Sequence, residues 1–385
     1  MSTQVLLDQS LDMLLPAIRM RRAEIEQARR LPRDLVDELC ATGIFSLAVP
    51  RAIGGREGSP FDIMRAIETI AAADGSTGWC AMVGVANNAS AGYMPEAGAR
   101  EVYADPLRPT AGIAAPAGQA VRVPGGVRVS GRWPFASGIT HCEWLWAGCM
   151  VLENGQPRMT PHGPEIIHVC IPVAQVEVHD TWYVSGLSGT GSHDFSVRDV
   201  FVPEHRIFLL LDPAGHRPEP LFQLPALAWF VSQLACVSLG IARGALDDLL
   251  EIAQQKVPTM YQDVLAERPA TQLRVARAET RLAAARALLY ESVQALWDAR
   301  RDGVDPTARQ IALNRAASIQ AVETGAEVAR TANTLAGGSA IFVNAQLQRH
   351  MRDAEVITHH FTVAPHVWED VGRVVLGRAP AAAVF

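Results

Sequence analysis

The chain is poor in several features that particular functions require. It has 385 residues, with one lysine, Lys256, and six cysteines that form no Cys-x-x-Cys pair. Scattered cysteines in a long chain indicate free thiols in a reducing cytoplasm and give no sign of a zinc site. Arginine and lysine number 34 against 40 acidic residues, so the basic excess that nucleic-acid binding needs is missing.

Long apolar runs are also missing. No uninterrupted stretch of about 18 apolar residues occurs, and this predicts that no segment spans a membrane. The N-terminus has neither the basic start nor the small-residue cleavage site of a signal peptide. The chain is nevertheless 49% hydrophobic and only 19% charged, which excludes a disordered protein.

What is present divides the chain into three regions. Residues 1–109 show helical periodicity, residues 110–215 are short strand-like runs separated by turn signals, and residues 216–385 return to long helices. The predicted fold is mainly α with an inserted β domain, a sandwich or small barrel, followed by a helical bundle. The predicted helices are 11–30, 32–41, 61–73, 77–91, 224–256, 270–300, 306–335 and 344–359.

The densest segment is Gly131–Gly148, with the sequence GRWPFASGITHCEWLWAG. Aromatic runs in a β domain usually fill its core, and that interpretation stays open. The alternative is a flat wall for a planar ligand, with Ser137 hydrogen-bonding the ligand's edge. As a small hydroxyl at a strand end, Ser137 is expected to be exposed, so that its loss would change stability little.

A glycine-rich loop lies in Asp180–Arg206, with the sequence GLSGTGS leading into a strand. A dinucleotide fingerprint must open a helix, so this loop does not indicate a Rossmann site. It is either a structural turn or a ligand contact made through Thr190 and Ser192.

Two features mark the end of the bundle. Gly337-Gly338 closes one predicted helix, and His359-His360 closes the next. The histidines are either solvated residues near a helix C-terminus or a functional pair. No third His or carboxylate stands at metal-ligand spacing, so no metal is predicted.

Together these segments resemble the acyl-CoA dehydrogenase superfamily over roughly residues 15–375. The motifs that carry the resemblance are P-x(3)-GG at Pro50, ADGSTGW, W-x(3)-SG, GLSGTGSHD and GG-x(9)-QR-x(2)-RD. The family fold is a helical N-terminal domain, a middle β domain and a C-terminal four-helix bundle, the same order that the periodicity predicts.

One position distinguishes branches of this family. Dehydrogenases usually carry a catalytic Glu about nine residues after the Arg-Asp pair, and here that position is Phe361, beside His360. The segment is instead similar to two-component flavin monooxygenases of this fold. These include the oxygenases that act on p-hydroxyphenylacetate, secosteroid phenols, dibenzothiophene and indole-type compounds. They carry a His facing the flavin, which His360 matches best.

The resemblance implies a chemistry. A separate NAD(P)H:flavin reductase would supply reduced FMN or FAD, and O2 would add at flavin C4a. The resulting hydroperoxide would hydroxylate a small aromatic or heteroaromatic substrate. Ser137 would hold the proton at flavin N5, and His360 would act as a general base or as a hydrogen-bond donor. The family is also expected to form homotetramers.

The resemblance further implies contacts, carried over residue by residue. The cofactor would contact Trp133, Phe135, Ser137, Thr190, Ser192, Gln272 and Arg274, and Gly337 and Gly338 of a neighbouring subunit. The substrate would contact His141 and His359. Two other activities of the same fold remain open at this stage: an acyl-CoA dehydrogenase or oxidase with a relocated Glu, and an N-oxygenase of an amine or amino sugar.

Overall fold

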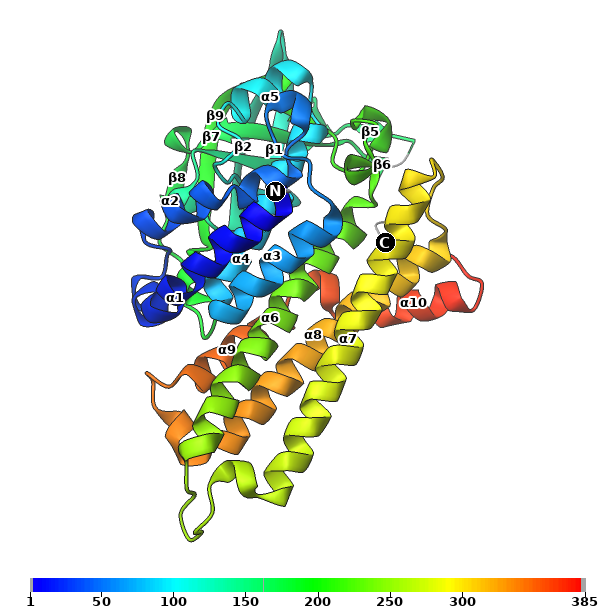
Figure 1. The fold of residues 1–385 in the computed structure, drawn as a ribbon. Helices are drawn as coiled ribbons and strands as arrows, with labels where there is room; N and C mark the ends of the chain where they lie inside the picture. Colours follow the sequence, from blue (N-terminus) through cyan, green and yellow to red (C-terminus); the bar gives the residue numbers. More distant parts are fainter. Residues whose placement is uncertain (1–2, 162, 382–385) are drawn as a thin grey trace.

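The computed structural model describes residues 3–161 and 163–381. The outer ends of the first and last predicted domains, residues 1–2 and 382–385, lie outside this range. Helices come first, then a sheet, then a helical bundle (Figure 1), so the predicted order of layers is confirmed. The N-terminal helices are α1 (Thr3–Ala28), α2 (Arg33–Thr42), α3 (Pro60–Ala73), α4 (Gly75–Asn88) and α5 (Glu96–Val102).

Local sequence sets the two helices that reach the middle of the molecule. Ser59 and Asp62 form a reciprocal capping box at the start of α3, with Pro60 in its first turn. The Asp74 carboxylate caps α4 by accepting from the backbone N–H of Thr77 at 2.8 Å. Because α4 is apolar nearly all round, it is buried between the sheet and the bundle.

The middle region forms one mixed eight-stranded sheet. Its strand order is β10-β7-β3-β1-β2-β9-β8, with β4 paired to β3, so β10 and β8 are its edges. Pro124 and Gly125 join β1 to β2 as a hairpin, with Val123 opposite Gly126. The strands are β1 (Ala111–Val123), β2 (Gly126–Ala136), β3 (Trp144–Glu153), β4 (Gln156–Pro157), β7 (Ile166–Pro172), β8 (Glu177–His179), β9 (His193–Pro203) and β10 (Ile207–Phe208), and a separate pair is β5 (Met159–Thr160) with β6 (Gly163–Pro164).

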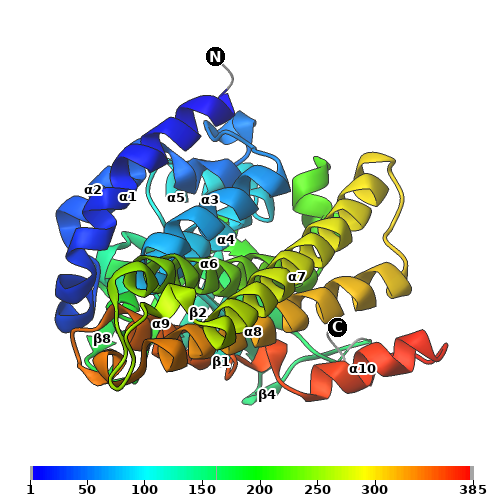
Figure 2. The same cartoon turned by 60° about the horizontal axis from the view of Figure 1, so that its bottom comes forward.

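In Figure 1 the sheet lies above α3 and α4 and the bundle lies below them, and Figure 2 shows the long helices of the bundle running side by side. Its four helices match the predicted ones closely except at the last end, which falls at Ile357 and leaves both histidines in a turn. A further helix, α10, follows. The C-terminal helices are α6 (Ala226–Gln255), α7 (Pro269–Arg301), α8 (Ala308–Ala336), α9 (Gln346–Ile357) and α10 (His366–Val375).

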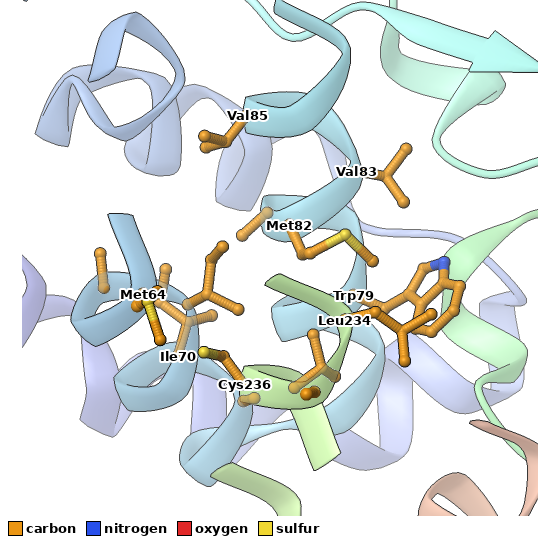
Figure 3. Packing of buried hydrophobic residues seen from close by; sticks show 14 of the residues in the cluster. Met64, Ile70, Trp79, Met82, Val83, Val85, Leu234 and Cys236 are labelled. Carbon is orange, nitrogen blue, oxygen red and sulfur yellow. The ribbon is translucent and has the colours of Figure 1, made fainter. Parts of the chain in front are cut away.

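Helix α6 is the most apolar long helix among the described residues. By length and composition it is apolar enough to cross a membrane, although 78% of the apolar stretch is buried inside the protein. That burial is typical of the central helix of a folded core. Leu234 and Cys236 of α6 pack against Trp79 and Met82 of α4 and Met64 of α3 (Figure 3).

All six cysteines are free, and five of them are buried. Burial raises the pKa of each of their thiols, and of Cys149 to about 12.

Candidate active site

A tryptophan from the N-terminal helices connects the two residues that the family resemblance marks as catalytic. The Asp74 cap fixes the first turn of α4, which carries Trp79 toward the sheet and the bundle. Trp79 Nε1 donates to Ser137 Oγ at 3.0 Å. The indole ring also lies 6.1 Å from the His360 ring, centroid to centroid. The structure therefore brings Ser137 and His360 to one place, with Trp79 between them.

Ser137 lies where β2 leaves the sheet. Phe135 has a φ of +66° and Gly138 a φ of +77°, so the backbone turns sharply on both sides of the serine. The Gly138 N–H donates to the Thr190 carbonyl at 3.0 Å, which fixes this turn to the glycine-rich loop.

Three hydroxyls connect in series behind Trp79, and we call Ser137, Ser192 and Thr190 the hydroxyl chain. Ser137 Oγ lies 2.7 Å from Ser192 Oγ, and Ser192 Oγ lies 2.6 Å from Thr190 Oγ1. Thr190 Oγ1 donates to the Leu187 carbonyl at 2.8 Å.

The directions of these hydrogen bonds follow from the two ends. A carbonyl only accepts, so the Thr190 proton is committed to Leu187. Ser192 must then donate to Thr190, and Ser137 must donate to Ser192. The Trp79 N–H can only donate, which agrees with this order. Ser137 is left with no free proton, and what it can offer a ligand is a lone pair.

Exposure distinguishes the members of the hydroxyl chain. Ser137 keeps 7% of its surface exposed, whereas Ser192 keeps 2% and Thr190 keeps 1%. The expectation that Ser137 is an exposed hydroxyl is therefore wrong, because Trp79 and Ser192 enclose it. Ser192 and Thr190 lie deeper still, so their hydroxyls support Ser137 and have almost no surface of their own for a ligand.

His360 begins a short 3-10 turn, Phe361–Val363, and its side chain caps that turn. Nδ1 accepts from the Thr362 backbone N–H at 3.4 Å and lies 2.7 Å from Thr362 Oγ1. Because an N–H points at Nδ1, we assign the neutral tautomer with its proton on Nε2. Nε2 has no hydrogen-bond partner among the described residues and is not sealed from solvent. His360 therefore presents a free N–H donor.

The charge state of His360 is set by its surroundings. Burial, with the nearby Arg315 cation adding to it, lowers the pKa of His360 to about 4. Arg315 also donates from Nη2 to the Thr362 carbonyl at 3.0 Å, and so holds the turn that orients the ring. Phe230 and Phe361 lie 5.9 and 4.9 Å from the His360 ring. The imidazole is neutral throughout the physiological pH range.

The glycine-rich loop that carries the hydroxyl chain is anchored to the bundle. The Leu187 N–H donates to Asp353 Oδ1 at 2.6 Å. Burial, with the Asp74 carboxylate adding to it, raises the pKa of Asp353 to about 7. Gly186 is needed here because a Cβ would lie 2.4 Å from the Arg352 carbonyl oxygen. The GLSGTGS loop and the Arg352-Asp353 motif therefore pack against each other.

Trp133 does not fit the role that the resemblance gave it. Its side chain is completely buried, stacks on Phe195 at 4.9 Å and donates to the Gly148 carbonyl at 2.8 Å. It is a core residue of the sheet, with no surface to face a cofactor. Phe135 differs, because it is 65% exposed and meets Trp182 edge to face at 6.2 Å.

The two histidines expected at the substrate lie in different settings. His141 is buried, and its Nδ1 has no partner among the described residues. Burial, assisted by the Arg33 charge, lowers the pKa of His141 to about 4. His359 is exposed in the turn next to His360. Among the described residues, neither side chain hydrogen-bonds Ser137 or packs ring to ring on His360.

The four remaining predicted contacts lie at the other end of the bundle. His360 meets α6 at Phe230, whereas Lys256, just beyond the opposite end of α6, donates to Ser339 Oγ at 2.6 Å. At 1.5 Å per residue, the two ends are roughly 38 Å apart. That distant end carries the exposed residues Gln272, Arg274, Gly337 and Gly338. Within one subunit they cannot reach the Trp79 site.

Sequence reasoning missed three residues of the site: Trp79, Arg315 and Thr362. Trp79 closes the ADGSTGW motif, and that was a usable signal. Nothing in the sequence marks Arg315, because its role depends on how α8 packs against a turn far along the chain.

Other possible binding features lie elsewhere. A cavity of about 370 Å³ is on the outer side of the glycine-rich loop, between α1 and the sheet, where Arg29, Thr140 and His193 line it. Neither the hydroxyl chain nor His360 lines it. In the described part of the chain, no group of three or more His, Cys, Asp or Glu side chains could hold a metal ion.

Comparisons with known proteins identify the family of this chain. Residues 6–112 match the acyl-CoA dehydrogenase N-terminal domain, and residues 232–365 match the C-terminal domain. Indole-3-acetate monooxygenase of Pseudomonas putida is 35% identical over 94% of this chain and 91% of its own. The oxygenase component of the FADH(2)-dependent resorcinol hydroxylase of a Rhizobium species is 31% identical over 91% and 88%.

A solved structure gives the same result. XiaF from a Streptomyces species, in complex with FADH2 and glycerol, superposes with a TM-score of 0.91 at 26% identity and covers 99% of this chain and 98% of its own. The chain belongs to the acyl-CoA dehydrogenase superfamily and is one of its flavin-dependent monooxygenases.

Proposed function

We propose that the chain is the oxygenase component of a two-component system, which uses reduced flavin and O2 to hydroxylate a small aromatic or heteroaromatic compound. The observation that carries the proposal is the neutral His360, with its free Nε2–H, across Trp79 from Ser137. The described side chains that touch these two residues are aromatic rings and hydroxyls, and the charge near His360 is the Arg315 cation. None is a carboxylate, which removal of a thioester α-proton needs.

The site has the features that a reduced flavin needs. Exposed Phe135 and Phe361 offer flat apolar surface, and the lone pair of Ser137 and the N–H of His360 offer one polar contact of each kind. Reduced flavin, when bound, supplies the electrons that activate O2. The FADH2-bound relative supports FAD as the flavin.

The side chains then have distinct tasks. Trp79, Phe230 and Phe361 surround His360 with apolar surface that keeps water from the reacting atoms. His360 donates a hydrogen bond from Nε2 to an oxygen of the substrate or of the activated O2. Because Nδ1 is already occupied and Nε2 carries the proton, His360 cannot accept a substrate proton without first giving up its own. We therefore favour the donor role over the general-base role.

The names of the relatives suggest the substrate and the partners. Indole-3-acetate and resorcinol are both electron-rich aromatic compounds. The designation "oxygenase component" supports a separate NAD(P)H:flavin reductase. We also propose a homotetramer in the cytoplasm, in which a neighbouring subunit brings Gly337, Gly338, Gln272 or Arg274 to the cofactor.

The experiment combines the purified chain with an unrelated flavin reductase, NADH, flavin and ¹⁸O2. Indole-3-acetate, resorcinol and a panel of phenols serve as substrates. We expect one ¹⁸O atom in the product, and neither product nor NADH consumption when the reductase is left out. Oxidation of NADH by the chain alone, in step with product, would overturn the two-component assignment. Reduction of chain-bound flavin by an acyl-CoA would favour a dehydrogenase.

A further inference from the structure

The direction of the hydroxyl chain has a consequence for which flavin the site accepts. Every proton in the series is committed toward the Leu187 carbonyl, so Ser137 meets a ligand only as an acceptor. A ligand atom that contacts Ser137 must therefore be a donor. Reduced flavin carries a hydrogen on ring nitrogen N5, whereas the same nitrogen of oxidised flavin bears only a lone pair.

We propose that Ser192 and Thr190 are specificity-determining positioning residues, which fix Ser137 as an acceptor and so make the site select reduced over oxidised flavin. This inference rests on the proposed function. It differs from the roles that the sequence suggested for these two residues, because neither hydroxyl has surface enough to touch the cofactor.

Reversing the direction of the hydrogen bonds in the hydroxyl chain would be unfavourable. Ser137 can donate to an oxidised flavin only by giving up its 2.7 Å bond to Ser192, or by a reversal in which Ser192 turns toward Ser137 and Thr190 toward Ser192. The Leu187 carbonyl would then lose the hydroxyl that now donates to it at 2.8 Å. Its amide N–H is held separately by Asp353, so the peptide cannot easily rotate to find another donor. The selection thus depends on one buried hydrogen bond.

The test is a set of binding measurements on intact protein. The affinities for reduced flavin, without oxygen, and for oxidised flavin are measured by titration, and their ratio is compared among variants. Ser192→Ala removes the acceptor of the Ser137 proton and frees that proton for a ligand. We expect oxidised flavin to bind at least about fivefold tighter, the equivalent of about 1 kcal/mol, with little change for reduced flavin.

Matched variants distinguish an effect of hydrogen-bond direction from an effect of side-chain packing. Thr190→Val removes the last donor and should shift the ratio the same way, whereas Thr190→Ser keeps the hydroxyl and should keep the wild-type ratio. Ser90→Ala removes a hydroxyl as buried as these, bonded to Tyr103 away from the site, and should change neither affinity.

The outcomes are distinct. A wild-type protein that binds neither form of flavin overturns the proposed function itself. A wild-type protein that binds both forms equally, or a Ser192→Ala protein that keeps the wild-type ratio, overturns the inference and leaves the proposed function standing. Equal weakening of both affinities in Ser192→Ala shows a packing role and also overturns it.

Discussion

Replacement of His360 by glutamine should separate the two roles that a histidine can have at this site. The side-chain amide of Gln places an N–H donor near the position of Nε2 but has no basic nitrogen. If His360 works as a donor, His360→Gln should keep most of the hydroxylation that His360→Ala loses. Hydrogen bonds to charged groups contribute about 1.5–3 kcal/mol, so the alanine variant should lose roughly 10- to 150-fold in product formation. The glutamine variant should recover to within about tenfold of wild type.

The assay compares product formed with flavin oxidised, at saturating reduced flavin and fixed O2. Binding of reduced flavin to each variant is measured first, so that a lost cofactor is not read as lost chemistry. His359→Ala is the matched control, because His359 is exposed and outside the ring contacts of the site. Since the pKa of His360 is lowered to about 4, wild-type product yield should be flat from pH 6 to pH 8 as far as this residue decides it. The donor role would be refuted if the glutamine variant were as inactive as the alanine variant and the product yield of the wild type fell as pH dropped through about 6.5.

Two substitutions and one measurement of oligomeric state test the surroundings of the site. The folded protein keeps the Asp353 proton up to about pH 7, whereas the unfolded chain releases it near pH 4, so this group lowers stability as pH rises through that window. Asp353→Asn keeps an acceptor for the Leu187 N–H and should raise the unfolding free energy by about 2–4 kcal/mol at pH 8 but not at pH 4. Urea unfolding at one protein concentration measures this, and the same pH dependence of stability in the variant and the wild type would contradict it. Arg315→Met removes a cation that lowers the pKa of His360. The pH at which product yield falls on acidification should therefore move upward, and an unchanged pH would be evidence that Arg315 does not influence the charge of His360. Light scattering should show a tetramer, and a stable monomer that still binds reduced flavin would exclude a neighbour's contribution to the site.

Much of the fold could be predicted from local patterns. Local signals such as the Ser59-Pro60 cap and the Pro124–Gly126 turn depend on a few neighbouring residues, so the sequence shows them directly. The absence of proline from α8 can likewise be read from the sequence. The end of α9 was predicted two residues late. No Gly or Pro stands within the first seven residues after Ile357, and the helix stops because the His360 side chain caps the next turn, a feature that spacing does not reveal.

The side-chain directions at the end of β2 show the limit of this reasoning. Strict alternation would put Trp133, Phe135 and Ser137 on one face of the sheet. The register shifts between Trp133 and Ala136, and Phe135 takes a positive φ, so the three separate into core, surface and hydrogen-bond network. The sequence could name the segment, but only the tertiary structure shows which of its residues reaches the site. The same holds for Trp79, which lies more than fifty positions from its partner Ser137.

The burial of the cysteines has a meaning for an enzyme that handles oxygen. An oxygenase that fails to transfer its oxygen atom releases hydrogen peroxide beside its own side chains. Peroxide attacks the thiolate and hardly the thiol, and oxidation then proceeds through sulfenic acid to forms that the cell cannot repair. Because burial keeps all six cysteines protonated, the protein should withstand many unproductive turnovers without chemical damage to them. Mass spectrometry after prolonged turnover without substrate should find these six side chains unmodified, and the exposed Met260, Met20 and Met13 oxidised first.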